Sequence, residues 1–383
     1  MDLTIDQSNL SRVLRLVGRA LPTRTSLPIL QSVRLEADQN LLRLSTSDGE
    51  LALTTSIAVD VLHPGQVAIP ARLLAEYVSQ LPEEPVRLSL DSARSRVRAS
   101  CWHFRADFAC LDPNSFPQSP SPEGDSTFDL EPLALRKTID RVAFAACKDD
   151  SRPTLTAVLF DFSEHGLTLA AADGFRLARA RLGGVTAPSR QLLVPARAVS
   201  EFGRVLVEGE RASLGLSADD RGVHLISGPT TLYSRLVEGR FPDVDRVVPK
   251  SWETKITVET ATLRQAVRLT SLFGGSGKGE GRVIILEAEK GVLRLRARGD
   301  QTGEAESEIE AALEGAPQVI ALSTALLTDI LDAVESKEVE LAWTRPTLPL
   351  TVRDSESAEP ANVFVMMPVL DPSLTARIPA GAA

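Results

Sequence analysis

SLPILQSVRLEADQNLLRLSTSDGELAL, residues 26–53, is the stretch that decides the fold, because it returns twice further along the chain. The second copy is SRPTLTAVLFDFSEHGLTLAAADGFRLA, residues 151–178, and a more divergent third copy is GRVIILEAEKGVLRLRARGDQTGEA, residues 281–305. The first two copies are about 125 residues apart, which is far longer than the roughly 20–50 residues of a solenoid repeat. The sequence therefore predicts three copies of one small domain.

Each copy carries two helical segments and a set of alternating strands. NLSRVLRLVGRAL, residues 9–21, places its apolar side chains on one face at a period of 3.6, and matching segments begin near Pro132 and Glu259. The second helices follow Pro70 and Pro195, where proline suits the first helical turn, and begin near Ser323 in the third copy. Period-2 alternation predicts roughly eight short antiparallel strands per copy. We expect an α+β fold in which two helices cover one face of each sheet.

The repeat sets the expected domain boundaries. The copies predict three related domains over residues 1–122, 123–252 and 253–383, and the Pro- and Ser-rich stretch Pro113–Ser126 is the clearest linker. Residues 371–383 are expected to form a mobile tail.

Composition limits the class of protein. The chain has 383 residues, a net charge of −9 and three cysteines (Cys101, Cys110 and Cys147) without metal-ligand spacing. The N-terminus has no signal-peptide pattern, and no apolar run approaches the roughly 20 residues of a membrane span. We therefore expect a cytoplasmic protein without a membrane partner, a metal or a cofactor.

Basic residues recur at the same outward position of the related helices. Arg12, Arg15 and Arg19 lie opposite the apolar face of the first helix. For a single helix, a solvated surface explains such a pattern, but its repetition favours a surface that binds the phosphates of duplex DNA without reading bases. The full set of predicted DNA-binding residues is Arg12, Arg15, Arg19, Arg24, Arg72, Lys137, Arg141, Lys148, Arg152, Arg197, Arg264 and Arg268.

Five motifs extend the argument to a known family. They are SLPIL at Ser26, ADGFRLA at Ala172, VPAR at Val194, VEGRFPDVDRVVPK at Val237 and FVMMP at Phe364. In this order and spacing, the chain resembles the bacterial DNA polymerase III beta subunit, the sliding clamp, from Met1 to about Leu370. The resemblance implies a head-to-tail homodimer, a ring of six domains that encloses duplex DNA and tethers other proteins to it.

The resemblance also implies partners and two further sites. The partners are the DNA polymerase III catalytic subunit, an ATP-dependent clamp loader, and other replication and repair proteins that bind clamps, all in the bacterial cytoplasm at the nucleoid. The implied dimer contact pairs Ala106 and Phe108 with Leu272 and Phe273 of a second copy. The implied peptide pocket comprises Leu155, Ala172, Gly174, Phe175, Arg176, Leu177, Pro242, Arg246, Val247, Pro349, Val365, Met366, Met367, Pro368 and Val369.

Two other classes of function remain as alternatives. An enzyme is disfavoured, because the four histidines stand singly and the HExxH, P-loop and GxSxG motifs are missing from the sequence, so no catalytic residue is predicted. The other alternative is a monomeric three-domain scaffold that binds DNA. Retention on closed circular DNA at high salt would distinguish it from a ring.

Overall fold

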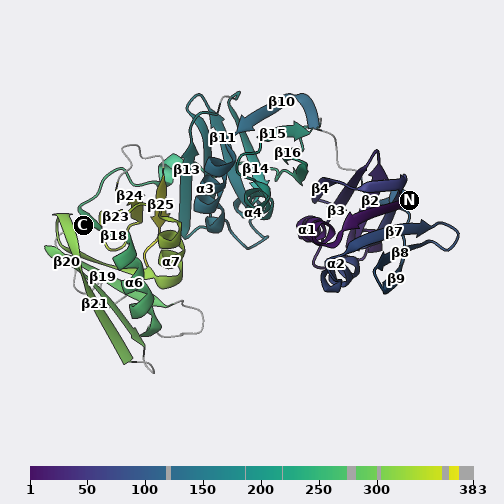
Figure 1. The fold of residues 1–383 in the computed structure, drawn as a ribbon. Coiled ribbons are helices and arrows are strands. Elements are labelled where there is room, and N and C mark those ends of the chain that lie inside the picture. Colours follow the sequence, from purple (N-terminus) through teal and green to yellow (C-terminus); the bar gives the residue numbers. More distant parts are fainter. Residues whose placement is uncertain are drawn as a thin grey trace. The chain divides into compact units, whose positions relative to one another are not determined.

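Antiparallel sheets dominate the computed structural model, which describes residues 1–117, 122–185, 187–217, 219–273, 282–299, 303–355 and 362–370 (Figure 1). The chain divides into two compact units. One combines Met1–Arg136 with Arg197–Leu236, and the other combines Lys137–Ala196 with Val237–Ala383. The predicted tail at residues 371–383 and part of the predicted linker lie outside the described residues.

The first copy of the repeat lies wholly in unit 1. Its helices are α1 (Gln7–Val17) and α2 (Ala71–Gln80), which pack against each other. Five strands form a sheet in the order β5-β1-β7-β8-β9: β1 (Asp2–Asp6), β5 (Asp60–His63), β7 (Pro85–Asp91), β8 (Arg96–Cys101) and β9 (Phe104–Ala109). The remaining strands of this copy are β2 (Ser32–Asp38), β3 (Leu41–Ser47), β4 (Leu51–Ala58) and β6 (Gly65–Pro70).

The other sheet of unit 1 joins two copies of the repeat. Its order is β10-β15-β16-β17-β4-β3-β2-β6, so strands of the second copy continue the sheet of the first. The junction is the antiparallel pair β17–β4, in which Leu232 lies opposite Leu53. The elements from the second copy are β10 (Pro122–Leu130), α4 (Ala196–Val205), β15 (Ala212–Ser217), β16 (Gly222–Ser227) and β17 (Thr230–Arg235).

Unit 2 repeats this arrangement with one sheet of twelve strands. The order is β14-β11-β12-β13-β25-β24-β23-β18-β21-β20-β19-β22, and the pair β13–β25 joins the second copy to the third. Its second-copy elements are β11 (Ala157–Ser163), β12 (Gly166–Ala172), β13 (Arg176–Leu182), β14 (Arg190–Pro195) and the part of α3 (Pro132–Val142) from Lys137 onward. The others are α5 (Val244–Val247), β18 (Thr254–Glu259), α6 (Thr260–Thr270), β19 (Val283–Glu289), β20 (Gly291–Gly299), β21 (Gly303–Gly315), β22 (Gln318–Ser323), α7 (Thr324–Ala333), β23 (Glu338–Trp343), β24 (Leu350–Asp354) and β25 (Val363–Met366).

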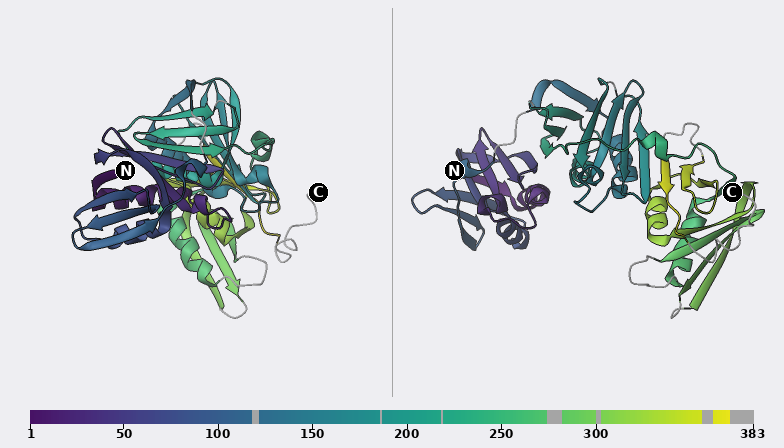
Figure 2. Two further views of the ribbon diagram at one scale, coloured as in Figure 1. Left: turned by 90° about the vertical axis from the view of Figure 1, so that its right-hand side faces the viewer. Right: turned by 180° about the vertical axis from the view of Figure 1, so that it is seen from behind.

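The helices use the faces that their periodicity predicts. In α1, Leu10, Val13, Leu14 and Val17 are buried, whereas Arg12 and Arg15 are exposed. In unit 2, α6 and α7 lie side by side and pack against each other (Figures 1 and 2). Leu263 of α6 and Leu327 of α7 are buried. No described helix is long enough to cross a membrane.

One detail of the predicted helices is corrected. Pro70 is the last residue of β6 and the N-cap of α2, so it precedes the first helical turn instead of lying within it. The fixed φ of proline still restricts the chain where the strand ends and the helix begins.

Equivalent hairpin turns stand at the end of β3 and of β12. Asp48 accepts hydrogen bonds from the backbone of Glu50 and Leu51, and Asp173 does the same for Phe175 and Arg176. The glycines that follow, Gly49 and Gly174, have φ values of 101° and 96°, which L side chains rarely adopt. This repeated turn is structural, and in the second copy it positions the residues that are described next.

Candidate functional site

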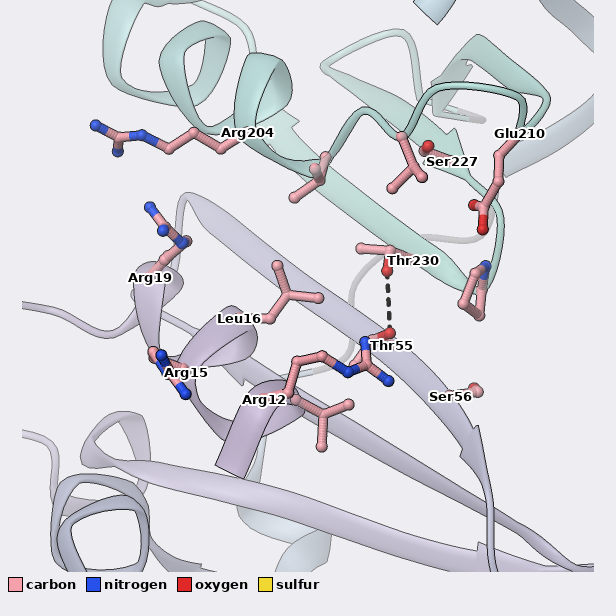
Figure 3. Close-up of a pocket in the computed structure, with 14 residues that line it drawn as sticks. Arg12, Arg15, Leu16, Arg19, Thr55, Ser56, Arg204, Glu210, Ser227 and Thr230 are labelled. Atoms are coloured by element: carbon pink, nitrogen blue, oxygen red, sulfur yellow. Dashed lines mark hydrogen bonds between the residues drawn. The ribbon is translucent and has the colours of Figure 1, made fainter. Parts of the chain in front are cut away.

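A basic groove lies in unit 1 beside the N-terminal helix. It has a volume of about 600 Å³. Arg12 and Arg15 enter it from α1, Arg19 from the 3₁₀ turn that follows, and Arg204 from α4 (Figure 3). The other polar lining residues are Thr55, Ser56, Glu210, Ser227 and Thr230. Four of the lining residues are arginines and one, Glu210, is acidic, a composition that suits anions such as phosphate.

Glu201 fixes two of the four arginines. Its carboxylate lies 3.3 Å from Arg19 Nη1 and also binds Arg204 Nη1, and its side chain is only 10% exposed. Arg12 and Arg15 are exposed, and no ion pair joins either to another described residue. The groove therefore keeps its excess positive charge at the α1 side, where a phosphate meets the least competition.

Two predicted DNA-binding residues hold the segment that follows α1. Arg197 pairs with Asp48 and donates to the carbonyl oxygens of Arg19 (3.2 Å) and Leu21 (3.4 Å). Arg72 donates to the carbonyl oxygen of Pro22 at 2.9 Å. These arginines therefore orient the backbone around Arg19. Arg24 is exposed two residues beyond Pro22.

The predicted cations of unit 2 fall into two groups. Lys137, Lys148 and Arg268 are exposed. Arg141 is instead held by Asp354 at 2.8 Å and Glu335 at 3.3 Å, with its side chain 13% exposed. Arg264 donates to the carbonyl oxygens of Leu331 and Val334. The outward position expected for Arg141 and Arg264 is thus corrected, because neighbouring elements of the third copy cover them.

Arg152 lies beside the second hairpin turn. Its guanidinium donates to the carbonyl oxygen of Asp173 at 3.1 Å and contacts Cys147 Sγ at 3.3 Å. Hydrogen bonds from Ser151 lower the pKa of the neighbouring Asp149 carboxyl, whose oxygen is 3.8 Å from Arg152 Nε. This predicted DNA-binding residue therefore contacts the turn that carries the predicted pocket residues.

Two apolar clusters of unit 2 meet at this turn. One consists of Ala157, Leu159, Ala170, Leu193 and Phe241, with Leu155, Ala172, Val237 and Val244 packed against it. The other consists of Leu177, Val363 and Val365, with Ala172, Val244 and Val248 packed against it. The shared, partly buried residues Ala172 and Val244 make one continuous apolar surface, and such surfaces bind peptides and small molecules.

The predicted pocket residues occupy different depths of this surface. Leu177, Val365 and Met366 are buried, and Leu155, Ala172, Pro349, Pro368 and Val369 are half-buried. The exposed ones are Gly174, Phe175, Pro242, Arg246, Val247 and Met367. Met367 donates its backbone N–H to the carbonyl oxygen of Phe175 at 2.8 Å, which brings the two exposed apolar side chains to one rim.

Arg176 follows the second hairpin turn, and neighbouring residues hold its side chain. Its side chain is 8% exposed, with Nε 3.0 Å from Asp173 and Nη1 bound to Asp329. It also donates to the carbonyl oxygen of Phe144 at 3.0 Å and lies over the Phe144 ring. Arg176, a residue of the predicted pocket, therefore has a structural role in this turn, whereas Arg246 is exposed and lies 3.0 Å from Asp243.

Three family models match consecutive parts of the sequence. They describe the N-terminal, central and C-terminal domains of the DNA polymerase III beta subunit, over residues 1–120, 129–243 and 245–369. This chain belongs to the DNA polymerase III beta subunit family. It is a DNA sliding clamp, and the sequence-based prediction of a non-catalytic processivity subunit is confirmed by that membership.

Individual relatives cover the chain almost completely. The Beta sliding clamp of Streptomyces coelicolor is 31% identical over 96% of this chain and 99% of its own length. A DnaN sliding clamp from Pseudomonas aeruginosa bound to griselimycin has a TM-score of 0.89 at 26% identity, covering 97% of this chain and 100% of its own. The sliding clamp from Bacillus subtilis, with a TM-score of 0.90 at 23% identity, supports the fold alone.

Sequence reasoning missed several residues of the apolar surface. Val237, Val244 and Val248 pack against the two clusters, and Phe241 is buried within one of them. The signal was present, because all four fall within the run VEGRFPDVDRVVPK. Among the described residues, no group of three or more His, Cys, Asp or Glu side chains is arranged to hold a metal ion.

Proposed function

We propose that two copies of this chain close head to tail into a ring that encircles duplex DNA. The ring tethers the DNA polymerase III catalytic subunit, and other replication and repair proteins, through the apolar surface of unit 2. An ATP-dependent loader must open the ring, because a closed ring cannot thread onto circular DNA. The ring works at the nucleoid.

The observation that carries this proposal is a repeated junction. At both internal junctions, the fourth strand of one copy pairs with the last strand of the next: β4 with β17, and β13 with β25. In the third copy, β21 occupies the position of β4 and β13. In the first copy, β9 occupies the position of β17 and pairs only with β8 among the described strands. A second copy can therefore supply the third junction in each direction.

The internal junctions also predict the register of the third. Their central pairs are Leu53 opposite Leu232 and Ala178 opposite Phe364. Leu53 lies opposite Thr46 in its hairpin, and Ala305 lies opposite Ala297 in the matching hairpin of the third copy, so Ala305 corresponds to Leu53. Leu232 lies opposite Leu225, and Ala106 lies opposite Ala99 in the matching hairpin of the first copy, so Ala106 corresponds to Leu232. The third junction accordingly pairs Ala106 of one copy with Ala305 of the other.

The other predicted interface residues differ in how they are arranged. Phe108 is 4% exposed and packs against Tyr77 with ring centroids 5.6 Å apart, so it supports β9 from inside its own chain. Leu272 and Phe273 are exposed in the short 3₁₀ turn after α6. We assign direct contact to Ala106, Leu272 and Phe273, and a supporting role to Phe108.

Disulfide trapping tests the ring directly. Opposite residues of an antiparallel pair have Cβ atoms about 4.5–5.5 Å apart, close enough for a disulfide to form after a small adjustment. We expect the double variant Ala106→Cys/Ala305→Cys to form a covalent dimer on oxidation, and each single variant to stay monomeric on a denaturing gel. Cross-linked rings should remain on closed circular DNA at high salt and leave linearised DNA. Equal loss from both DNA forms would favour the monomeric scaffold.

The basic groove supplies the contact with DNA inside this ring. Arg12 and Arg15 are exposed and without an ion pair among the described residues, which suits a loose, sequence-independent contact with phosphates. The exposed Lys137, Lys148 and Arg268 of unit 2 add to it. A net charge of −9 for the whole chain limits adhesion of DNA elsewhere on the protein.

A further inference from the structure

A second cleft in unit 2 has no part in the proposed ring. It has a volume of about 590 Å³ and lies between the segment 245–252 and strands β13, β18, β23 and β24. In those strands, alternation turns Ile256, Leu341 and Val352 into the core. Lys255, Glu340 and Arg353, at intervening positions, line the cleft instead.

The charges that line this cleft do not balance. Arg179, Lys250, Lys255 and Arg353 face only two carboxylates, Asp245 and Glu340. Asp245 lies 2.7 Å from Arg179 Nη1, and Glu340 lies 3.8 Å from Lys255 Nζ. Lys255 Nζ also lies 2.7 Å from Glu314, which is outside the cleft. Lys250 and Arg353 are therefore the two lining cations for which no ion pair joins them to another described residue.

Arg353 is the most informative of these residues. It lies directly across from Glu340 in the β23–β24 pair, yet no ion pair joins them. Its Nε is buried and has no hydrogen-bond partner among the described residues. A half-buried guanidinium without a partner is costly, and its planar set of donors matches the oxygens of a phosphate or carboxylate.

Trp252 gives the cleft an aromatic wall. Its side chain is 44% exposed, and Lys255 Nζ lies 5.3 Å from the ring centroid. The hydrogen bond to Glu314 raises the pKa of Lys255, so this lysine stays charged beside the ring. An exposed indole in a cleft that is also lined by cations is the combination on which bases stack while their phosphates are neutralised.

We propose that this cleft is a nucleotide-binding site, in which Arg353 and Lys250 bind the phosphate and Trp252 stacks on the base. The volume lies in the range of about 300–1,000 Å³ that is usual for small-ligand pockets. The ligand is a nucleoside monophosphate group, either free or within a single strand. The site is independent of the ring and of the basic groove in unit 1.

Titration of the full-length protein with four probes tests the site. Trp102→Phe removes a second exposed tryptophan, so that a change of fluorescence on adding ligand reports mainly Trp252, since Trp343 is buried and out of reach of the ligand. In this background we expect dTMP and inorganic phosphate to bind once per chain, with dTMP tighter. Stronger binding of a (dT)10 oligonucleotide would identify a single strand as the source, and stronger binding of dTMP would identify a free nucleotide. Tighter binding of a tetraglutamate peptide than of either would overturn the proposal in favour of a peptide site.

Matched variants locate the binding. Arg353→Met should weaken dTMP binding about tenfold or more, whereas Arg345→Met, an exposed arginine outside the cleft, should not. Lys250→Ala, at an exposed position that tolerates truncation, should weaken it severalfold, with Lys290→Ala as its control. In a separate calorimetric titration, Trp252→Ala should weaken dTMP about fivefold or more and leave inorganic phosphate unchanged. Unchanged dTMP affinity in both Arg353→Met and Lys250→Ala would refute the site, while retention on circular DNA would be unaffected in all variants.

Discussion

Leu53 and Leu232 lie opposite each other across strands β4 and β17, and both are completely buried although they belong to different copies of the repeat. The junction between copies is thus as much a hydrophobic core as a hydrogen-bonded strand pair. Leu232→Ala should lower the free energy of unfolding by about 2–5 kcal/mol, as truncation of a buried leucine does. Chemical denaturation measures this, with the exposed Leu73→Ala as control, expected within about 0.5 kcal/mol of the unmodified chain. If both variants lost a similar amount of unfolding free energy, the junction between β4 and β17 would not be the hydrophobic core that we assign to it.

Stability should fall in acid because of one buried histidine. His224 is 1% exposed, both of its ring nitrogens lack partners among the described residues, and it stacks against Tyr233. Burial lowers its pKa to about 4, and the charge of Asp219 opposes the shift only in part. The unfolded chain therefore binds a proton that the folded chain does not between about pH 6.5 and pH 4.

The corresponding contribution to stability is complete above pH 6.5 and is lost as the pH falls to 4. It amounts to at most about 3 kcal/mol. Denaturation at several pH values should show that His224→Phe removes this part of the pH dependence. His165→Gln, at an exposed histidine, should retain it. A His224→Phe profile as steep as that of the unmodified chain would show that other groups are responsible.

Arg12 and Arg15 should set the salt dependence of DNA binding. Each phosphate contact contributes a slope of about 0.9 to the plot of log affinity against log salt concentration. Arg12→Ala/Arg15→Ala should reduce the slope by up to about 2, measured by anisotropy of a short linear duplex. Arg94→Ala, in the exposed turn between β7 and β8, is the matched control and should leave the slope unchanged. An equal reduction in both proteins would indicate a general effect of charge.

Gly174 should tolerate no side chain at the second hairpin turn. Its φ is 96°, and a Cβ there would lie 3.0 Å from Arg152 Nη1. Gly174→Ala should lower the free energy of unfolding by about 1–3 kcal/mol. Gly183→Ala, where a Cβ meets nothing within 4 Å and φ is not positive, should be nearly neutral. The comparison of the two midpoints of denaturation isolates the strain of this turn.

The rim of the apolar pocket should govern the affinity for the polymerase. Phe175 is 63% exposed, and a backbone hydrogen bond joins it to the segment of Met367. Phe175→Asp should weaken binding of the catalytic subunit at least about tenfold in surface plasmon resonance, because an apolar contact becomes a buried charge. Leu62→Asp, at an equally exposed leucine of unit 1, should have no effect. Weakened binding by Leu62→Asp would point to a different docking surface.

The sequence was most informative where a pattern repeats and least where distant segments meet. The buried stripe of α1 and the paired turns at Asp48 and Asp173 follow from local periodicity and turn chemistry. The buried position of Arg141 could not be predicted in this way. Helical periodicity describes only the helix itself, whereas Asp354, its partner, is 213 residues away in the sequence.

The same limit applies to single residues of the predicted sites. Phe108 matched a family position, but only the packing of Tyr77 reveals that it faces its own core. Arg176 also matched a family position, but only its pairing with Asp329 of α7 reveals that its side chain is nearly buried. Val244 and Val248 could have been found, since an apolar residue in a connecting segment usually packs on something.

The exchange of strands between neighbouring copies has a consequence for any attempt to dissect this protein. The second copy contributes β15–β17 to one sheet and β11–β14 to the other. In a fragment of residues 123–252, β17 would lose its neighbour β4 and β13 would lose its neighbour β25, which leaves two unpaired strand edges. Unpaired strand edges recruit other chains and drive aggregation. A single repeat cut out of this protein should therefore aggregate instead of folding. Proteolytic cleavage in a loop, which leaves the strand pairs intact, should disturb folding far less than removal of a whole repeat.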